Sequence, residues 1–107
     1  METILVMTNL PDQDSAERLA RVLIEARLAA CVNVMAPCSS IYHWRGKTET
    51  ALEIPVLIKT LRRHYSQVEE AIRQHHPYEL PEIVAVAVTD GLPAYLAWVA
   101  AETTTNN

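Results

Sequence analysis

The sequence predicts an α+β domain with the ferredoxin-like order β-α-β-β-α-β, followed by a C-terminal helix. One observation behind this fold class is that apolar segments typical of strands alternate with two amphipathic helical segments in this order. A second is that the 107 residues are 50% hydrophobic, which suits a single compact domain over residues 1–107. A third is that no internal repeat or linker divides the chain. We therefore expect an antiparallel sheet with its helices on one face.

The first strand and the first helix are marked by a change of hydrophobic period. Ile4–Met7 is an apolar run that ends at Asn9 and Pro11, as a buried strand does where it leads into a turn. Asp14 and Glu17 have the spacing of a capping box, so we expect the helix to begin there. Its apolar face is formed by Ala16, Leu19, Ala20, Leu23 and Ala26.

The middle of the chain predicts a long hairpin. Val32–Met35 is a second strand that breaks near Pro37 and resumes over Ile41–Trp44, and Gly46 supplies the turn. The return strand is expected to be the longest in the chain, with alternating apolar residues at Leu52, Ile54, Val56 and Ile58. Pro55 cannot donate a hydrogen bond to a strand ladder, so we expect a bulge or a sheet edge at that point.

The last third of the chain predicts a helix, a strand and a final helix. The second helix is expected to begin near Leu61 and to end by His76, because Pro77 follows. Its apolar face is formed by Leu61, Tyr65, Val68 and Ile72. Ile83–Val88 is a continuous apolar strand, and Pro93–Ala101 is a short helix that carries Tyr95 and Trp98. Such a sheet leaves one face and both edges uncovered, which favours an oligomer.

Charge and hydropathy exclude several classes of partner. Nine Lys and Arg stand against thirteen Asp and Glu, for a formal net charge of -4, and this acidic balance argues against a nucleic-acid partner. The first residues lack the basic start and long apolar stretch of a secretory signal. No apolar run approaches the roughly 18 residues of a membrane span. We therefore expect a cytoplasmic protein without a membrane partner.

The two cysteines are expected to remain reduced. Cys31 and Cys38 flank a segment that contains Pro37. If that segment is extended, they lie about 23 Å apart, which is too far for a disulfide. Cys31 follows the first helix, and because free cysteines are usually buried we expect it to be a core thiol.

His75 and His76 form the densest cluster of potential metal ligands. Histidines at a helix C-terminus also interact favourably with free carbonyl groups, so a purely structural role is an open alternative. A metal site needs a third donor brought in by the fold, for which the thioether of Met7 on the first strand is the best candidate. Two imidazoles and a thioether suit copper, particularly Cu(I), better than Mg²⁺ or Ca²⁺.

Two further groups of residues invite interpretation. Arg62 and Arg63 stand at the start of the second helix, where an anion would offset their charge; nearby carboxylates such as Glu69 or Glu70 would do the same. Tyr42 and Trp44 share one face of the hairpin, beside Glu49 and Glu53 on the facing strand, and are expected to serve a subunit interface.

No catalytic triad, phosphate loop or paired-carboxylate motif has a supporting context, so we expect no enzyme.

Several short segments, taken together, resemble one known family. They are Leu28–Val34, Ser40–Tyr42, Trp44, Gly46, Lys47, Glu49, Glu53, Ile58–Thr60, His76–Glu79, Pro81–Ile83, and Tyr95, Leu96, Trp98 and Val99. In these segments the chain is similar to the CutA divalent-cation tolerance proteins, over nearly its whole length from Ile4 to Val99.

The resemblance implies a ferredoxin-like subunit and a homotrimer built by pairing sheet edges, with an architecture similar to the PII signalling proteins. It also implies a role in metal tolerance, with copper or another divalent cation as ligand. Some members carry Cys where Met7 stands here and pair it with histidines that match His75 and His76. The expected function is a cytoplasmic, homotrimeric copper-binding protein; the alternative is a PII-like signalling or scaffold trimer that binds an anion or a protein partner.

Overall fold

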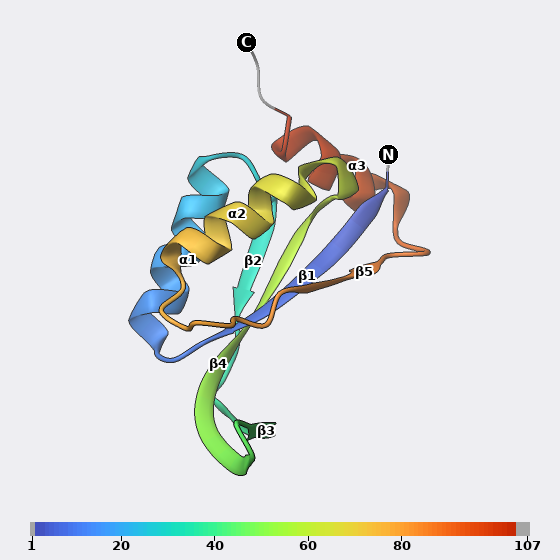
Figure 1. Cartoon of the computed structure of the whole chain (residues 1–107). Coiled ribbons are helices and arrows are strands. Elements are labelled where there is room, and N and C mark those ends of the chain that lie inside the picture. Colours follow the sequence, from blue (N-terminus) through green and yellow to red (C-terminus); the bar gives the residue numbers. More distant parts are fainter. Residues whose placement is uncertain (1, 105–107) are drawn as a thin grey trace.

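The computed structural model describes residues 2–104 and follows the predicted order of elements (Figure 1). The elements are β1 (Thr3–Leu10), α1 (Gln13–Glu25), β2 (Cys31–Val34), β3 (Cys38–Trp44), β4 (Lys47–Leu61), the 3-10 turn η1 (Arg62–His64), α2 (Tyr65–His75), β5 (Val84–Ala87) and α3 (Pro93–Glu102). All strand pairs are antiparallel, in the order β2-β4-β1-β5, and β3 pairs with the remaining part of β4. The predicted fold class is confirmed.

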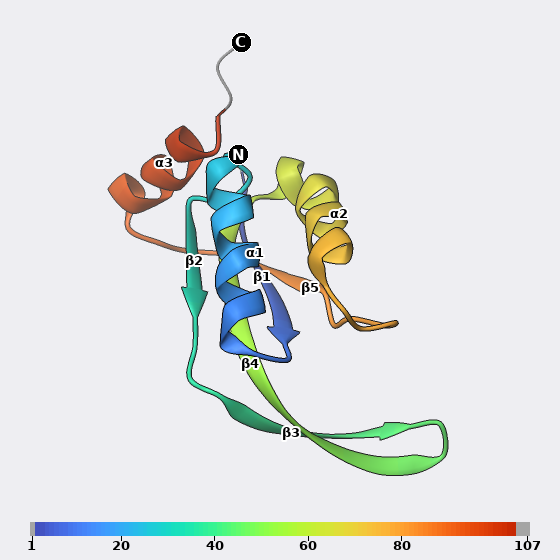
Figure 2. The ribbon, with the colours of Figure 1, turned by 90° about the vertical axis from the view of Figure 1, so that its left-hand side faces the viewer.

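Helices α1 and α2 cover one face of the sheet (Figure 2). On β1, Ile4, Val6 and Leu10 are fully buried beneath them, whereas the alternate residues Leu5 and Met7 are only half-buried on the opposite face. Leu19, Leu23, Val68 and Ile72 from the two helices and Val56 and Ile58 from β4 complete this core. Helix α3 packs separately, through Val99 and Ala100 against Leu61 at the end of β4.

Helix α1 begins two residues earlier than the capping-box pattern predicts, with Asp12 rather than Asp14 as its N-cap. Asp12 is its N-cap, with an extended backbone, and its Oδ1 accepts a hydrogen bond from the Ser15 amide at 2.8 Å. Asp14 lies in the first turn instead, where a carboxylate also interacts favourably with the helix dipole. The predicted start at Asp14 and Glu17 was therefore wrong, because two carboxylates stood within reach of the same helix end.

The ladder interruption expected at Pro55 occurs on one side only. The β1–β4 ladder runs through Asn9 and Pro55 without a break. On the other side, β2 pairs with β4 as far as Val34 opposite Val56, and β3 resumes with Cys38 opposite Glu53. Three residues therefore face two on β4, an extra-residue interruption located where Pro55 cannot donate. The Pro55 carbonyl still accepts a hydrogen bond from the Met35 amide at 2.9 Å.

Two other boundaries differ from the prediction, and the predicted end of α2 is confirmed. Leu61 is the last residue of β4, and a 3-10 turn separates it from α2, which begins only at Tyr65. Helix α2 ends at His75, and His76 is extended, as a residue before proline must be. Strand β5 is a short, exposed edge strand of four residues rather than six, since only Val84 to Ala87 pair with β1 and no other strand of residues 2–104 pairs with it.

The β3–β4 hairpin projects beyond the helical layer (Figures 1 and 2). Its turn consists of Arg45 and Gly46, both at positive φ (51° and 83°), the combination that a tight type I′ turn requires. Ile41 and Leu52 on this hairpin are about 70% exposed, with values of 71% and 68%. The hairpin contributes to a longest dimension of 46 Å, against 28 and 23 Å in the other directions. It therefore presents apolar surface outside the core of the subunit.

Both cysteines are free thiols, as predicted. Cys31 is only half-buried, so the expectation of a core thiol was wrong. Its side chain lies on the sheet face away from the helices, where its Sγ is 3.9 Å from the Lys59 Nζ. The same ammonium group donates to Asn33 Oδ1 at 2.8 Å. Within residues 2–104, no helix is long and apolar enough to cross a membrane.

Candidate functional site

His76 contacts β1 through its side chain, beyond the part of β1 that pairs with β5. Its Nε2 lies 2.5 Å from the carbonyl oxygen of Asn9, and its Nδ1 accepts a hydrogen bond from the Tyr78 amide at 3.2 Å. The Nε2 atom must therefore carry the proton and donate it to the carbonyl. Since both ring nitrogens are engaged and the residue is buried, His76 can bind a metal ion only if this local structure opens.

His75 has the geometry of a metal ligand that is held by a backbone group. It is the last residue of α2 and is exposed, and its Nδ1 lies 2.9 Å from the carbonyl oxygen of Ala71. That contact assigns the proton to Nδ1, which leaves the Nε2 lone pair directed away from the helix backbone. Metal-bound histidines commonly donate their second ring N–H to a carbonyl in this way.

Met7 lies on the face of the sheet opposite to the helix that carries His75. Its neighbours Val6 and Thr8 are buried under the helices, so the side chain of Met7 points to the opposite face of the sheet. Helix α2, which carries His75, packs on the helical face. Met7 and the helix that carries His75 therefore lie on opposite faces of the sheet, whereas His76 contacts β1 through the Asn9 carbonyl. The three-residue site of Met7, His75 and His76 stays a prediction. Among residues 2–104, no group of three His, Cys, Asp or Glu side chains could hold a metal ion.

The cations before α2 are offset by a carboxylate that the sequence interpretation did not consider. Arg62 forms two hydrogen bonds with Glu2, of 2.6 and 3.2 Å, and this pair lowers the pKa of the Glu2 carboxyl. Neither Glu69 nor Glu70 takes this role. The predicted anion site depended on Arg62 and Arg63. Because Arg62 is paired with Glu2, its charge is already offset by a carboxylate of the protein.

His64, in the 3-10 turn, should titrate at unusually low pH. Its Nε2 is buried without a hydrogen-bond partner among the described residues. Burial, with a smaller contribution from Arg63, lowers the pKa of the ring. The unfolded chain therefore takes up this proton first, and the corresponding stabilisation is present above about pH 6.5 and is lost as the pH falls through the folded-state pKa.

An NMR titration of the ring protons checks this, with the His64→Gln variant used to assign the signal. The expected midpoint lies below 6.5, the ordinary pKa of a histidine side chain. A midpoint at or above that value would contradict the burial argument.

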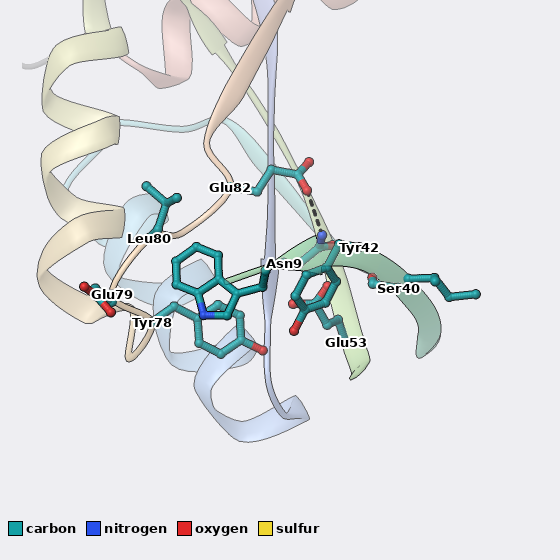
Figure 3. Close-up of a pocket in the computed structure, with 10 residues that line it drawn as sticks. Asn9, Ser40, Tyr42, Glu53, Tyr78, Glu79, Leu80 and Glu82 are labelled. Atoms are coloured by element: carbon teal, nitrogen blue, oxygen red, sulfur yellow. Dashed lines mark hydrogen bonds between the residues drawn. The ribbon is translucent and has the colours of Figure 1, made fainter. Parts of the chain in front are cut away.

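A large pocket lies between the hairpin, from Glu53 near its base to Trp44 beside its turn, and the segment that follows α2 (Figure 3). Its volume is about 680 Å³. It is lined by Asn9, Ser40, Ile41, Tyr42, Trp44, Glu53, Tyr78, Glu79, Leu80 and Glu82. The sequence analysis placed the aromatic pair beside Glu49 and Glu53 on one face of the hairpin. Strand pairing sets Glu49 opposite Tyr42 and Glu53 opposite Cys38, and Tyr42, Trp44 and Glu53 line the same pocket.

Aromatic rings and carboxylates dominate the chemistry of this pocket. Glu53 is 7% exposed, although it is charged. Burial and the neighbouring Glu53 carboxylate raise the pKa of Tyr78 to about 12, so its phenol remains neutral. Figure 3 shows the Tyr78 hydroxyl directed toward Glu53 and Tyr42. At the other side, Asn9 Nδ2 donates to Glu82 Oε1 at 3.0 Å.

Sequence reasoning missed the contributions of Asn9 and Glu82 to this pocket. They lie 73 positions apart. Asn9 lies on β1 two residues beyond Met7, the last residue paired with β5, so only the sheet register places it beside the segment after α2. No local pattern signals such a contact.

The comparisons with known proteins agree with this architecture. The model of the CutA1 divalent ion tolerance protein family matches residues 4–102. A divalent-cation tolerance protein CutA of Yersinia pestis is 39% identical over 96 residues, covering 90% of this chain and 81% of its own length.

Two solved structures are similar to the described fold. CutA from Xylella fastidiosa has a TM-score of 0.94 and 43% identity, covering 97% of this chain and 100% of its own. The protein of Archaeoglobus fulgidus described as a periplasmic divalent cation tolerance protein CutA has a TM-score of 0.93 and 32% identity, covering 95% and 99%. The family is described by tolerance to divalent ions and not by a catalysed reaction. The chain belongs to the CutA1 family of divalent ion tolerance proteins.

Proposed function

We propose that this member of the CutA1 family acts in metal tolerance by binding divalent cations, copper among them, as a homotrimer in the cytoplasm. The observation that carries the proposal is the family match over residues 4–102. Copper is the ion proposed because Cu²⁺ binds nitrogen donors more tightly than the other divalent first-row metals do.

His75 is the proposed ligand within the subunit. Its ring is exposed and held by the Ala71 carbonyl, with Nε2 left to bind. One imidazole gives weak binding alone, so the remaining donors must be water or groups of other subunits. Met7 has no place in this set, because it lies on the other face of the sheet, and the engaged His76 serves chiefly to hold the turn after α2.

The apolar surface of the subunit supports the homotrimer. Leu5 and Leu57 lie on the sheet face that no helix from α1 or α2 covers, and Val86 pairs with Leu5 on the same face. Strand β5 also has an unpaired edge, and the projecting hairpin exposes Ile41 and Leu52. A ring of subunits would cover these surfaces, since closed symmetry leaves no edge free.

The cytoplasm is proposed from the chemistry of the thiols. Cys31 and Cys38 are both free, and a reducing compartment keeps cysteines in that state. The description of the Archaeoglobus fulgidus relative as periplasmic applies to that protein.

Calorimetric titration with Cu²⁺ tests the role of His75. We expect His75→Ala to weaken the affinity about tenfold or more, since one such factor corresponds to the loss of a single modest interaction. His43→Ala is the matched control, because His43 is equally exposed but lies on the hairpin, and Met7→Leu should also leave the affinity unchanged. Unchanged binding by His75→Ala would show that the ion binds elsewhere, and weaker binding by Met7→Leu would overturn the separation of the sulfur from the site.

A further inference from the structure

The pocket beside the hairpin is lined by more carboxylates than the described residues pair with cations. Its lining includes the carboxylates of Glu53, Glu79 and Glu82. Arg45 pairs with Glu79 at 2.7 Å, at the exposed rim. Across the part of the chain that the structure describes, no cation pairs with Glu53 or Glu82. Since Glu53 is more than nine-tenths buried, its charge is poorly solvated and favours a positively charged neighbour.

The remaining walls of the pocket are suited to a cation of low charge density. Tyr42, Trp44 and Tyr78 line it from two separate segments of the chain. The guanidinium of Arg45 already lies over the Trp44 ring, 5.1 Å from its centroid, which shows that this ring accepts an organic cation. Aromatic faces attract ammonium and guanidinium groups that have a weak hydration shell, and they contact the attached carbon atoms at the same time.

The volume separates an organic ligand from a bare metal ion. About 680 Å³ is within the range of small-molecule sites. The described residues contain no cluster of ligands that could enclose a metal ion. The site is therefore wide, aromatic and acidic, rather than small and rich in donors.

We propose that this pocket binds a small organic cation with an ammonium or guanidinium group, with Glu53 as its buried counter-charge and the rings of Tyr42, Trp44 and Tyr78 as its walls. The neutral phenol of Tyr78, next to Glu53, adds a hydrogen-bonding group without adding charge. Arg45 lies at the rim of the pocket, where it pairs with Glu79 and stacks over the Trp44 ring. A bound cation would therefore displace the Arg45 side chain or lie next to it. The ligand differs from the divalent ion of the proposed function and occupies different residues.

Fluorescence of Trp44 in the assembled protein, freed of metal by a chelator, provides the test. A Trp98→Phe background removes the other indole. The probes are n-butylammonium, 1,4-diaminobutane and tetramethylammonium, with n-butanol as the neutral control, all at constant ionic strength. We expect saturable changes with the cations and none with butanol. Because metal has been removed, failure of copper binding would leave this result unaffected.

Two variants and one matched control locate the site. Glu53→Gln keeps the shape but removes the charge, and should weaken binding about tenfold or more. Tyr42→Leu, at a position that is 44% exposed, should weaken tetramethylammonium binding several-fold without disturbing the core. Glu25→Gln removes a carboxylate at an exposed position on α1, outside the pocket lining, and should bind as the parent does.

Three outcomes would overturn the proposal. One is the absence of a saturable signal at millimolar concentrations of every cation. Another is an equal affinity in the Glu53→Gln and parent proteins, which would show that the buried carboxylate plays no part. The third is binding that occurs only after the oligomer has been dissociated, because a basic side chain of another copy would then be the natural occupant.

Discussion

Replacing Leu19 with alanine is expected to lower the free energy of unfolding by about 2–5 kcal/mol. Leu19 is completely buried in the core between α1 and the sheet, beside Leu23 and the strand residues Val6 and Ile58. Alanine would leave a cavity that a close-packed interior fills only in part. Urea unfolding measures the loss, at fixed subunit concentration because assembly contributes to the apparent stability.

The matched control for this variant is Ile24→Ala on the same helix. Ile24 is 40% exposed and lies outside the buried core, so its truncation should cost less than about 1 kcal/mol. Similar losses for the two variants would mean that the helix does not bury the face assigned to it.

Replacing Val86 with lysine is expected to dissociate the assembled protein. Val86 is 48% exposed in the subunit, so the fold itself should tolerate a charge there. It lies opposite Leu5, on the sheet face away from α1 and α2, where the proposed trimer buries apolar surface. An ammonium group without a partner cannot be buried in such an interface without a large desolvation penalty. Light scattering should show the parent near three times the subunit mass of 12.0 kDa, and the variant near that mass.

Ile24→Lys is the control for the effect of charge alone. It adds the same group at a comparably exposed position on the outer surface of α1, and should leave the oligomer intact. The proposed assembly would be contradicted if the parent itself scattered as a monomer, or if Val86→Lys retained the parent mass with native circular dichroism.

The order of the elements could be predicted because each is determined by short-range physics. The helical spacing from Ala16 to Leu23 distinguishes α1 from the strands that flank it. Pro77 ends α2 because the residue before a proline avoids the helical conformation, and His76 is indeed extended. Gly46 marks the hairpin turn because its φ of 83° strains any residue with a Cβ.

Boundaries were less predictable, because alternatives of similar energy lie next to each other along the chain. Asp12 and Asp14 are both good helix starters, and the choice of Asp12 depends on the path of the chain after β1. Leu61 fits a helix face by spacing, yet it extends β4, where it packs against Val99 of α3. A contact with a residue 38 positions away decides that assignment, and no local pattern contains it.

The sequence by itself determined the fold class, the family resemblance and the residue types available for chemistry. Only the tertiary structure decided which of them meet. Alternation along β1 separates Met7 from Val6 in any strand, but the packing of α1 and α2 determines which of the two faces the helices. That packing places the helix that carries His75 on the face away from Met7. The fold as a whole brings Glu53, Tyr78 and Glu82 around one pocket. Such groupings depend on contacts between segments that are distant in the sequence. Bringing these segments together costs conformational entropy, which only the burial of the whole apolar core offsets.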